Sequence, residues 1–162
     1  MRGGRESKQG AQGANGSSEE SEAGSRTLRL VPGKRRLYFE DVEVRGSRSK
    51  GVSCRVTLRK GEASWMGEAQ GIEGDRSRLD LAARATVIAI AAAEEREGQL
   101  AVEGVKLIEA FERSFVFVAV TVRSGRDAKL LTGTCEVRES AETAGVLAVL
   151  DATNRWIEQG PE

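Results

Sequence analysis

Residues 52–70 of the chain read VSCRVTLRKGEASWMGEAQ, and the pattern of this stretch recurs later in the sequence. Its first half places an apolar residue at every second position from Val52 to Leu58, with polar residues between them. A period of two is typical of a strand with one buried and one solvated face. A turn at residues 60–62 and a second alternating run over 63–70 therefore predict a β-hairpin.

A further strand precedes this hairpin. After the turn signal Pro32-Gly33, residues 37–44 place apolar side chains at strand spacing, with an irregularity at Glu40-Asp41. The three predicted strands follow one another along the chain with short turns. We therefore expect them to form an antiparallel meander.

A helix is predicted after the meander, over residues 79–97. Ser77 and Asp80 read as a capping box at its start, and Gly98 supplies its stop. The segment 81–93 is apolar nearly all round. Because a surface helix keeps one polar face, we expect this helix to be buried on more than one side.

The second half of the chain repeats this plan. The predicted strands are residues 105–112, 115–123 and 129–138. The middle strand carries valines on one face, at positions 116, 118, 120 and 122. A final helix begins at Glu139 or Ser140 and ends at Gly160-Pro161.

The two halves also match in sequence. VTLRKG at 56–61 corresponds to VTVRSG at 120–125, and two extra residues in the second hairpin bring Gly67 onto Gly133. Glycine in a strand suits a place where a helix or another backbone crosses closely, although a simple bulge is the alternative. We predict an α+β fold of two tandem β-β-β-α units, each an antiparallel sheet covered by one helix.

The composition limits the chemistry. The chain has 162 residues, with 25 basic and 25 acidic side chains and no histidine. Serine-histidine and cysteine-histidine hydrolases are thereby excluded. Cys54 and Cys135 cannot complete a structural zinc site without histidine, so a metal site would need carboxylates alone. We predict no catalytic residues, no metal and no cofactor.

The N-terminal region differs from the rest. Residues 1–26 hold no large apolar side chain after Met1, which predicts a disordered tail. Residues 27–162 are predicted to form a single α+β domain, with repeats at about 36–98 and 103–160. The chain has neither a secretory h-region nor a long apolar run, so we expect a cytoplasmic protein with no membrane association.

These features together resemble a known domain. The tandem units, the small-Gly step on each third strand, and SAETAGVLAVLDATNR at 140–155 are similar to the C-terminal regulatory domain of 2-isopropylmalate synthases. The resemblance covers residues 36–159. It implies a non-catalytic domain that helps to hold a dimer and binds an end-product amino acid between its subdomains. The catalytic barrel of that family is a separate domain that these residues do not contain.

The resemblance also directs attention to two loops. The family has a Gly-x-Gly-Pro-like loop where this chain has residues 71–75, and a Gly-x-Asp-Ala-like step where it has 111–115. Both loops depart from the family pattern, so we carry over the architecture and not the ligand. The candidate ligand or partner surface is Gly71, Glu73, Gly74, Arg113 and Ser114. A glycine loop before a helix offers free amides to an anion, although an ordinary turn is the alternative.

Two further function classes stay open. A nucleic-acid-binding module would use the basic segment from Lys34 to Lys60. Its basic residues are Lys34, Arg35, Arg36, Arg45, Arg48, Lys50, Arg55, Arg59 and Lys60. The last α-β-β-β-α segment has the element order of a double-stranded RNA-binding domain, but its final helix begins with acidic residues. A carboxylate-dependent enzyme would use such residues as Glu68, Glu109 and Glu112.

The leading expectation is a non-enzymatic regulatory or protein-interaction module. Its expected partners are a small-molecule effector and a second copy of the chain. Two small meanders leave four sheet edges, and the apolar helix offers more apolar surface than one sheet covers. We therefore expect a homodimer.

Overall fold

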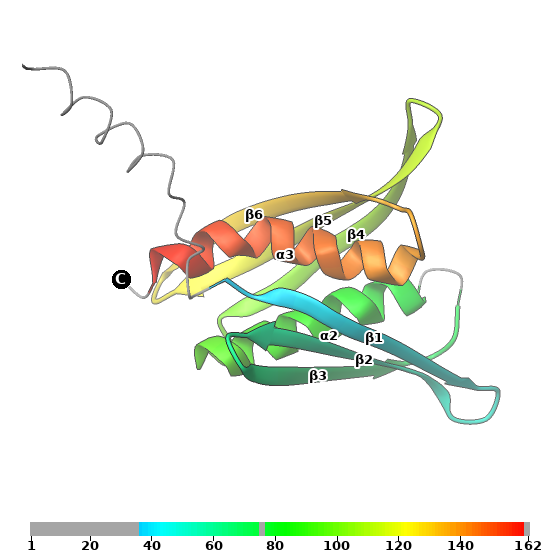
Figure 1. Ribbon diagram of the computed structural model, residues 1–162, viewed down its shortest axis with the longest axis horizontal. Helices are drawn as coiled ribbons and strands as arrows, with labels where there is room; N and C mark the ends of the chain where they lie inside the picture. Colours follow the sequence, from blue (N-terminus) through cyan, green and yellow to red (C-terminus); the bar gives the residue numbers. More distant parts are fainter. Residues whose placement is uncertain (1–35, 75–76, 161–162) are drawn as a thin grey trace, which may run out of the picture. The chain divides into compact units, whose positions relative to one another are not determined.

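The computed structural model describes residues 36–74 and 77–160, and the predicted tail at 1–26 lies outside them. The first repeat consists of β1 (Tyr38–Ser47), β2 (Gly51–Lys60), β3 (Ala63–Gly71) and α2 (Ser77–Glu94). The second consists of β4 (Leu100–Ala110), β5 (Arg113–Ser124), β6 (Asp127–Glu136) and α3 (Ala141–Gln159). Each repeat forms its own three-stranded antiparallel sheet, in the order β1-β2-β3 or β4-β5-β6 (Figure 1). The predicted fold of two tandem β-β-β-α units is confirmed.

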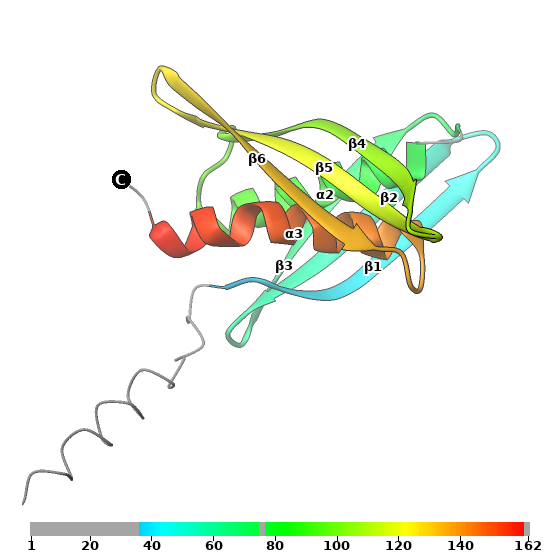
Figure 2. The same ribbon diagram turned by 90° about the horizontal axis from the view of Figure 1, so that it is seen from above.

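The two helices lie side by side in a layer between the two sheets (Figures 1 and 2). Helix α2 packs on β2 and β3 of its own sheet and on β4 of the other sheet. Helix α3 packs in the equivalent way on β5 and β6, and on β1 of the first sheet. Each helix therefore contacts both repeats, which makes one shared core.

The helices run in the same direction. Near their first turns, a Cβ built on Gly145 would lie 2.7 Å from Leu79 Cδ1. Beyond the end of α2, the guanidinium of Arg96 lies 4.4 Å from the ring centroid of Trp156 in α3. Trp156 and Trp65 both pack against the core, which is the ordinary role of a large aromatic side chain.

Gly67 and Gly133 allow the helices to approach the sheets closely. A Cβ built on Gly67 would overlap the carbonyl oxygen of Ala85 and lie 2.6 Å from the amide nitrogen of Ala89. A Cβ built on Gly133 would overlap the carbonyl oxygen of Ala148 in α3 and lie 2.5 Å from Ala152 N. The prediction that these paired glycines accept a crossing helix is confirmed.

Helix α2 is buried on several sides, as its sequence predicted. Ten of its 18 residues are buried, and Arg84 and Ile88 mark the narrow exposed stripe. Both sheets and α3 pack against this helix. The second repeat of the same chain supplies the cover that one sheet cannot, and the homodimer stays a prediction.

The strand register refines the predicted alignment of the repeats. Val56 pairs with Gly67, and Val118 pairs with Gly133, so Val118 rather than Val120 is the counterpart of Val56. The second hairpin is therefore longer by two residues on each of its strands, because an antiparallel pair must lengthen on both sides to keep its register. A shift of two leaves the buried face unchanged.

An irregularity recurs at equivalent places in the two edge strands β1 and β4. The predicted break at Glu40-Asp41 is a register shift between Phe39 and Asp41. Its counterpart in β4 lies between Val102 and Gly104. A nearby hydroxyl donates to the intervening glutamate in both cases, from Ser64 to Glu40 and from Thr121 to Glu103.

Several predicted boundaries were wrong. Strand β4 begins at Leu100 rather than at residue 105, and its hairpin turns at Phe111-Glu112, which both have positive φ. The predicted strand included Glu112 because this turn holds no glycine. Ser77 lies inside the first turn of α2 and bonds the backbone of Gly74, so it does not form the predicted capping box.

The end of α2 also differs from the expectation. The helix stops at Glu94, and Glu95 has a φ of 55°. The amide of Arg96 donates to the carbonyl of Ala91 at 2.9 Å, and the amide of Glu95 donates to that of Ala92 at 3.4 Å. This is the Schellman arrangement, in which the left-handed position usually holds glycine. Gly98 lies three residues further on and does not end the helix.

Glu95→Gly is expected to raise the free energy of unfolding by about 1 kcal/mol, because glycine adopts the left-handed conformation without strain from a Cβ. Urea denaturation measures the change. The matched control is Glu97→Gly, an exposed residue two positions on without positive φ, which should bring no gain. A stability of Glu95→Gly at or below that of wild type would contradict this account of the helix end.

Candidate functional site

A cleft of about 330 Å³ lies between the two repeats. Phe39 of β1 is its one lining residue from the first repeat, and the other eight come from β6, the segment between β6 and α3, and the first turns of α3 in the second. Its lining residues are Phe39, Cys135, Glu136, Arg138, Glu139, Ser140, Thr143, Ala144 and Leu147. Its volume falls in the range of small-molecule sites.

The packing of α3 explains the position of this cleft. Strands β1 and β6 are edge strands of different sheets, and both contact α3. The helix turns a narrow exposed stripe outwards between them, which begins near Thr143 and includes Leu147. Phe39, Ala144 and Leu147 supply the apolar part of the lining. A ligand bound here would touch both repeats at once.

The polar end of the cleft lies at the start of α3. Ser140 caps the helix, and its Oγ accepts from the amide of Thr143 at 3.1 Å. Glu136 pairs with Arg113 at 3.0 Å and with Arg138 at 3.4 Å. Glu139 is exposed beside them. This end therefore presents both acidic and basic groups together with two hydroxyls.

Cys135 is the thiol of this cleft, and Cys54 is buried in the core. Burial raises the pKa of both thiols, that of Cys54 to about 11. The charge of Glu142 adds to the effect on Cys54. Both thiols are thus protonated near neutral pH, whereas a nucleophilic cysteine needs a lowered pKa. The arrangement favours a structural role for the two cysteines.

The shift at Cys54 predicts a loss of stability in alkali. The thiol of an unfolded chain titrates near pH 8.5, so above that pH the unfolded chain releases a proton that the folded chain retains until about pH 11. The free energy of unfolding should therefore fall by roughly 2–3 kcal/mol across this window because of Cys54.

Urea denaturation at several pH values measures this loss, with Cys135→Ala as the background so that one thiol titrates. Adding Cys54→Ala should lower stability at every pH through lost packing, and should also flatten the pH dependence above pH 8.5. Parallel pH profiles with and without Cys54 would contradict the assignment.

The surface predicted from sequence falls into two groups on different sheets. Gly71 ends β3, Glu73 pairs with Arg78 at 2.6 Å, and Gly74 bonds Ser77. The other group opens β5. There Arg113 pairs with Glu136, and Ser114 Oγ donates to Glu109 at 2.6 Å. Each group bonds side chains of its own repeat, and only Glu136, the partner of Arg113, belongs to the cleft.

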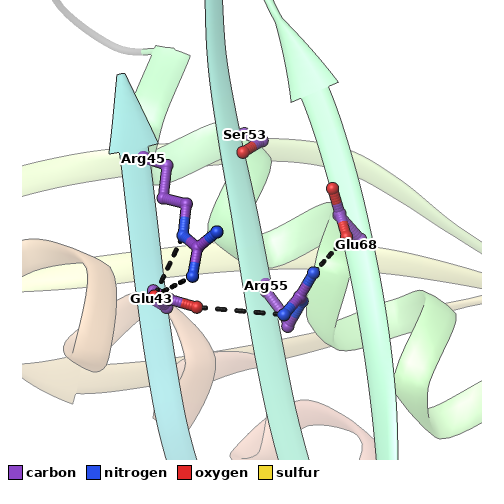
Figure 3. Close-up of a pocket in the computed structure, with 5 residues that line it drawn as sticks. All are labelled: Glu43, Arg45, Ser53, Arg55 and Glu68. Carbon is purple, nitrogen blue, oxygen red and sulfur yellow. Dashed lines mark hydrogen bonds and ion pairs between the residues drawn. The ribbon is translucent and has the colours of Figure 1, made fainter. Parts of the chain in front are cut away.

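A second, smaller hollow of about 50 Å³ lies on the outer face of the first sheet (Figure 3). It is lined by Glu43, Arg45, Ser53, Arg55 and Glu68. Arg45 pairs with Glu43 at 2.8 Å, and Arg55 pairs with Glu68 at 3.2 Å. Hydrogen bonds from Gln70 and Arg55 lower the pKa of Glu68, and the bond to Glu43 raises the pKa of Arg45. Charges on this face therefore neutralise one another.

This pairing bears on the nucleic-acid alternative. Lys34 and Arg35 lie outside the described residues. Besides Arg45 and Arg55, two more basic residues of the segment have carboxylate partners: Arg36 with Glu158, and Lys60 with Glu94. Arg48, Lys50 and Arg59 make no ion pair among the described residues, so the nucleic-acid alternative stays a prediction that would rest on these three side chains.

The carboxylates proposed for acid-base chemistry also have local partners. Glu109 accepts from Ser114, and Glu68 accepts from Arg55. Glu112 is exposed in the β4–β5 turn. Within residues 36–74 and 77–160, no three cysteine, aspartate or glutamate side chains are grouped so that they could hold a metal ion. That the chain is not an enzyme stays a prediction.

No protein-family model matches the sequence, and no curated protein matches it. The resemblance to the 2-isopropylmalate synthase regulatory domain is therefore still a prediction. Of the helices that the structure describes, neither has the length and apolarity that crossing a membrane requires.

Sequence reasoning missed the cleft itself. Phe39 and Cys135 lie almost a hundred positions apart, and no local pattern brings their strands together. The start of the last helix at Glu139 or Ser140 was predicted, and its position next to the polar end of the cleft was not. A usable signal was the repeat, because a shared core between two units implies seams where their edge strands meet the helices.

Proposed function

We propose that this chain is a non-catalytic regulatory module that binds a small amphiphilic molecule in the cleft between β1, β6 and α3. The observation that carries the proposal is that Phe39 of the first repeat completes a cleft whose other eight lining residues belong to the second. A ligand there contacts β1 on one side and β6 with α3 on the other. Its binding energy therefore favours one particular packing of the two repeats.

The lining indicates the chemical class of ligand. Phe39 and Leu147 suit a short aliphatic or aromatic group. Glu139 suits an ammonium group, and Arg138, an exposed side chain in a long 3.4 Å pair with Glu136, suits a carboxylate. An aliphatic amino acid carries all of these groups in a molecule that fits the cleft.

Calorimetric titration with a panel of aliphatic L-amino acids and their amines tests the proposal. Leu147→Trp fills the apolar part of the cleft and should weaken binding at least about tenfold, because the ligand loses its apolar wall. Arg155→Trp, an exposed position two turns further along α3, should leave binding unchanged. Absence of binding across the panel, or equal binding by Leu147→Trp, would contradict the proposal.

A further inference from the structure

The outer faces of the two sheets differ strongly, although the sheets have the same architecture. Outer here means the face that points away from the helices. The inner face of β5 carries Val116, Val118 and Val120, all fully buried. The residues between them in sequence, Phe115, Phe117 and Ala119, must therefore point outwards, because side chains alternate along a strand.

The pairing of Val56 with Gly67 and of Val118 with Gly133 aligns the two outer faces residue by residue. The central three rows of the first sheet are Arg45, Ser53 and Gln70; Glu43, Arg55 and Glu68; and Asp41, Thr57 and Met66. The corresponding rows of the second sheet are Ile108, Phe115 and Glu136; Lys106, Phe117 and Thr134; and Gly104, Ala119 and Thr132.

The positions of the second sheet that correspond to the charged hollow of Figure 3 are thus mostly apolar. Arg45, Ser53 and Arg55 are replaced by Ile108, Phe115 and Phe117. Leu130 extends the apolar surface into the next row, opposite Thr121. We call Ile108, Phe115, Phe117, Ala119 and Leu130 the outer strip. Ile108 and Leu130 are 40% and 58% exposed, and the other three are half-buried.

The adjoining hairpin extends this apolar surface. The β4–β5 hairpin projects beyond both helices (Figure 1). Phe111 at its tip is 91% exposed. Single exposed apolar residues are ordinary, but a strip that continues into a projecting apolar hairpin marks an interaction surface.

We propose that the outer face of β4–β6 is the surface through which two copies of this chain associate. The charges that flank the outer strip favour a second copy. Lys106 lies on β4 on one side of β5, and Glu136 lies on β6 on the other. A twofold axis parallel to β5 places each β4 over the β6 of the other copy. Lys106 of one copy then lies over the row of Thr134 in the other, one row from Glu136, whose carboxylate pairs with Arg113 and Arg138.

Other parts of the described chain fit this face poorly. The outer face of the first sheet would bury Asp41 and the charged groups of the hollow against phenylalanine, which is costly without new partners. Two copies of the outer strip instead place apolar side chains on apolar side chains. Two sheets packed face to face in this way adopt the aligned arrangement of β-sandwiches.

The size of the face is also appropriate. Strands β4, β5 and β6 have 11, 12 and 10 residues. With strands about 4.8 Å apart and a rise of about 3.3 Å per residue, they span a face of about 15 Å by 35 Å. Side-chain relief and the projecting hairpin bring this area towards the roughly 800 Å² per partner of a specific complex. This association does not depend on a ligand in the cleft.

Sedimentation equilibrium of the full chain across the micromolar range tests the proposal. The expected mass is twice the 17.4 kDa of one chain. Phe117→Arg introduces the residue that the first sheet carries at the equivalent position, and it should raise the dissociation constant at least about 30-fold. Ile108→Arg, on an edge strand and already exposed, should act in the same direction with little effect on folding.

The matched control is Thr57→Arg, the position in the first sheet that corresponds to Ala119. It should leave the dimer intact. Circular dichroism of each variant establishes that the chain is folded. A wild-type chain that is monomeric throughout the range would overturn the proposal, and so would a dimer that folded Ile108→Arg leaves unchanged. In that case we would infer that the outer strip binds a different protein.

Discussion

Gly133→Ala should lower the free energy of unfolding by about 3 kcal/mol or more, although it adds one methyl group. The added Cβ would overlap the carbonyl oxygen of Ala148 and lie 2.5 Å from the amide nitrogen of Ala152. Both atoms belong to the backbone of α3, which cannot move aside like a flexible side chain. The whole helix must shift away from β5 and β6, and its other contacts are lost.

Urea denaturation followed by far-UV circular dichroism measures this change. Gly67→Ala should have an effect of similar size, because its Cβ would meet Ala85 and Ala89 in the same way. Gly104→Ala is the control, since a Cβ built there in β4 meets no described atom within 4 Å. If Gly133→Ala were no less stable than Gly104→Ala, the close approach of helix and strand would be wrong.

Val120→Asp should be at least as severe, with an expected loss of about 4 kcal/mol or more, which leaves much of the chain unfolded. Val120 is fully buried on the inner face of β5, between Val102 and Leu131 of the neighbouring strands. An aspartate there finds apolar neighbours on both sides. Its charge must be buried without a partner, or the carboxyl must be protonated at a cost.

Thermal denaturation of the purified variant, or its failure to fold, measures this effect. Arg123→Asp is the control, because Arg123 is exposed near the end of the same strand. It tests whether an aspartate in β5 is itself harmful. A Val120→Asp variant that unfolds cooperatively with wild-type stability would contradict the assignment of the inner face.

Local patterns were sufficient to predict most of the fold. The alternation over 52–70 predicted β2 and β3, and the break at Glu40-Asp41 and the start of the last helix at Glu139 or Ser140 were also correct. Gly67 and Gly133 showed where the helices cross the strands. Each of these features depends on a few neighbouring residues, which a sequence shows directly.

Features that depend on unusual backbone conformations were missed. The β4–β5 turn uses Phe111 and Glu112 at positive φ, and α2 ends at Glu95 in the same region. Neither position carries the glycine that would have marked it. The surrounding strands and helix packing hold these residues in conformations that their own preferences disfavour.

Features that depend on distant parts of the chain were missed for another reason. The cleft joins β1 to β6, and pairing in the first sheet says nothing about the second. The outer strip had a signal: residues 115–122 are apolar at every position except Thr121. A continuous apolar run favours a strand that is covered on both faces. The sequence prediction considered only the face that carries the valines.

The most direct test of the proposed function is amide chemical-shift mapping of the full chain titrated with an aliphatic L-amino acid such as leucine. Our account predicts that the largest shifts occur at Thr143, Ala144 and Leu147 in α3 together with Phe39 in β1, because the ligand joins both repeats. Shifts confined to residues 71–74 and 113–114, or no shifts at all, would contradict it.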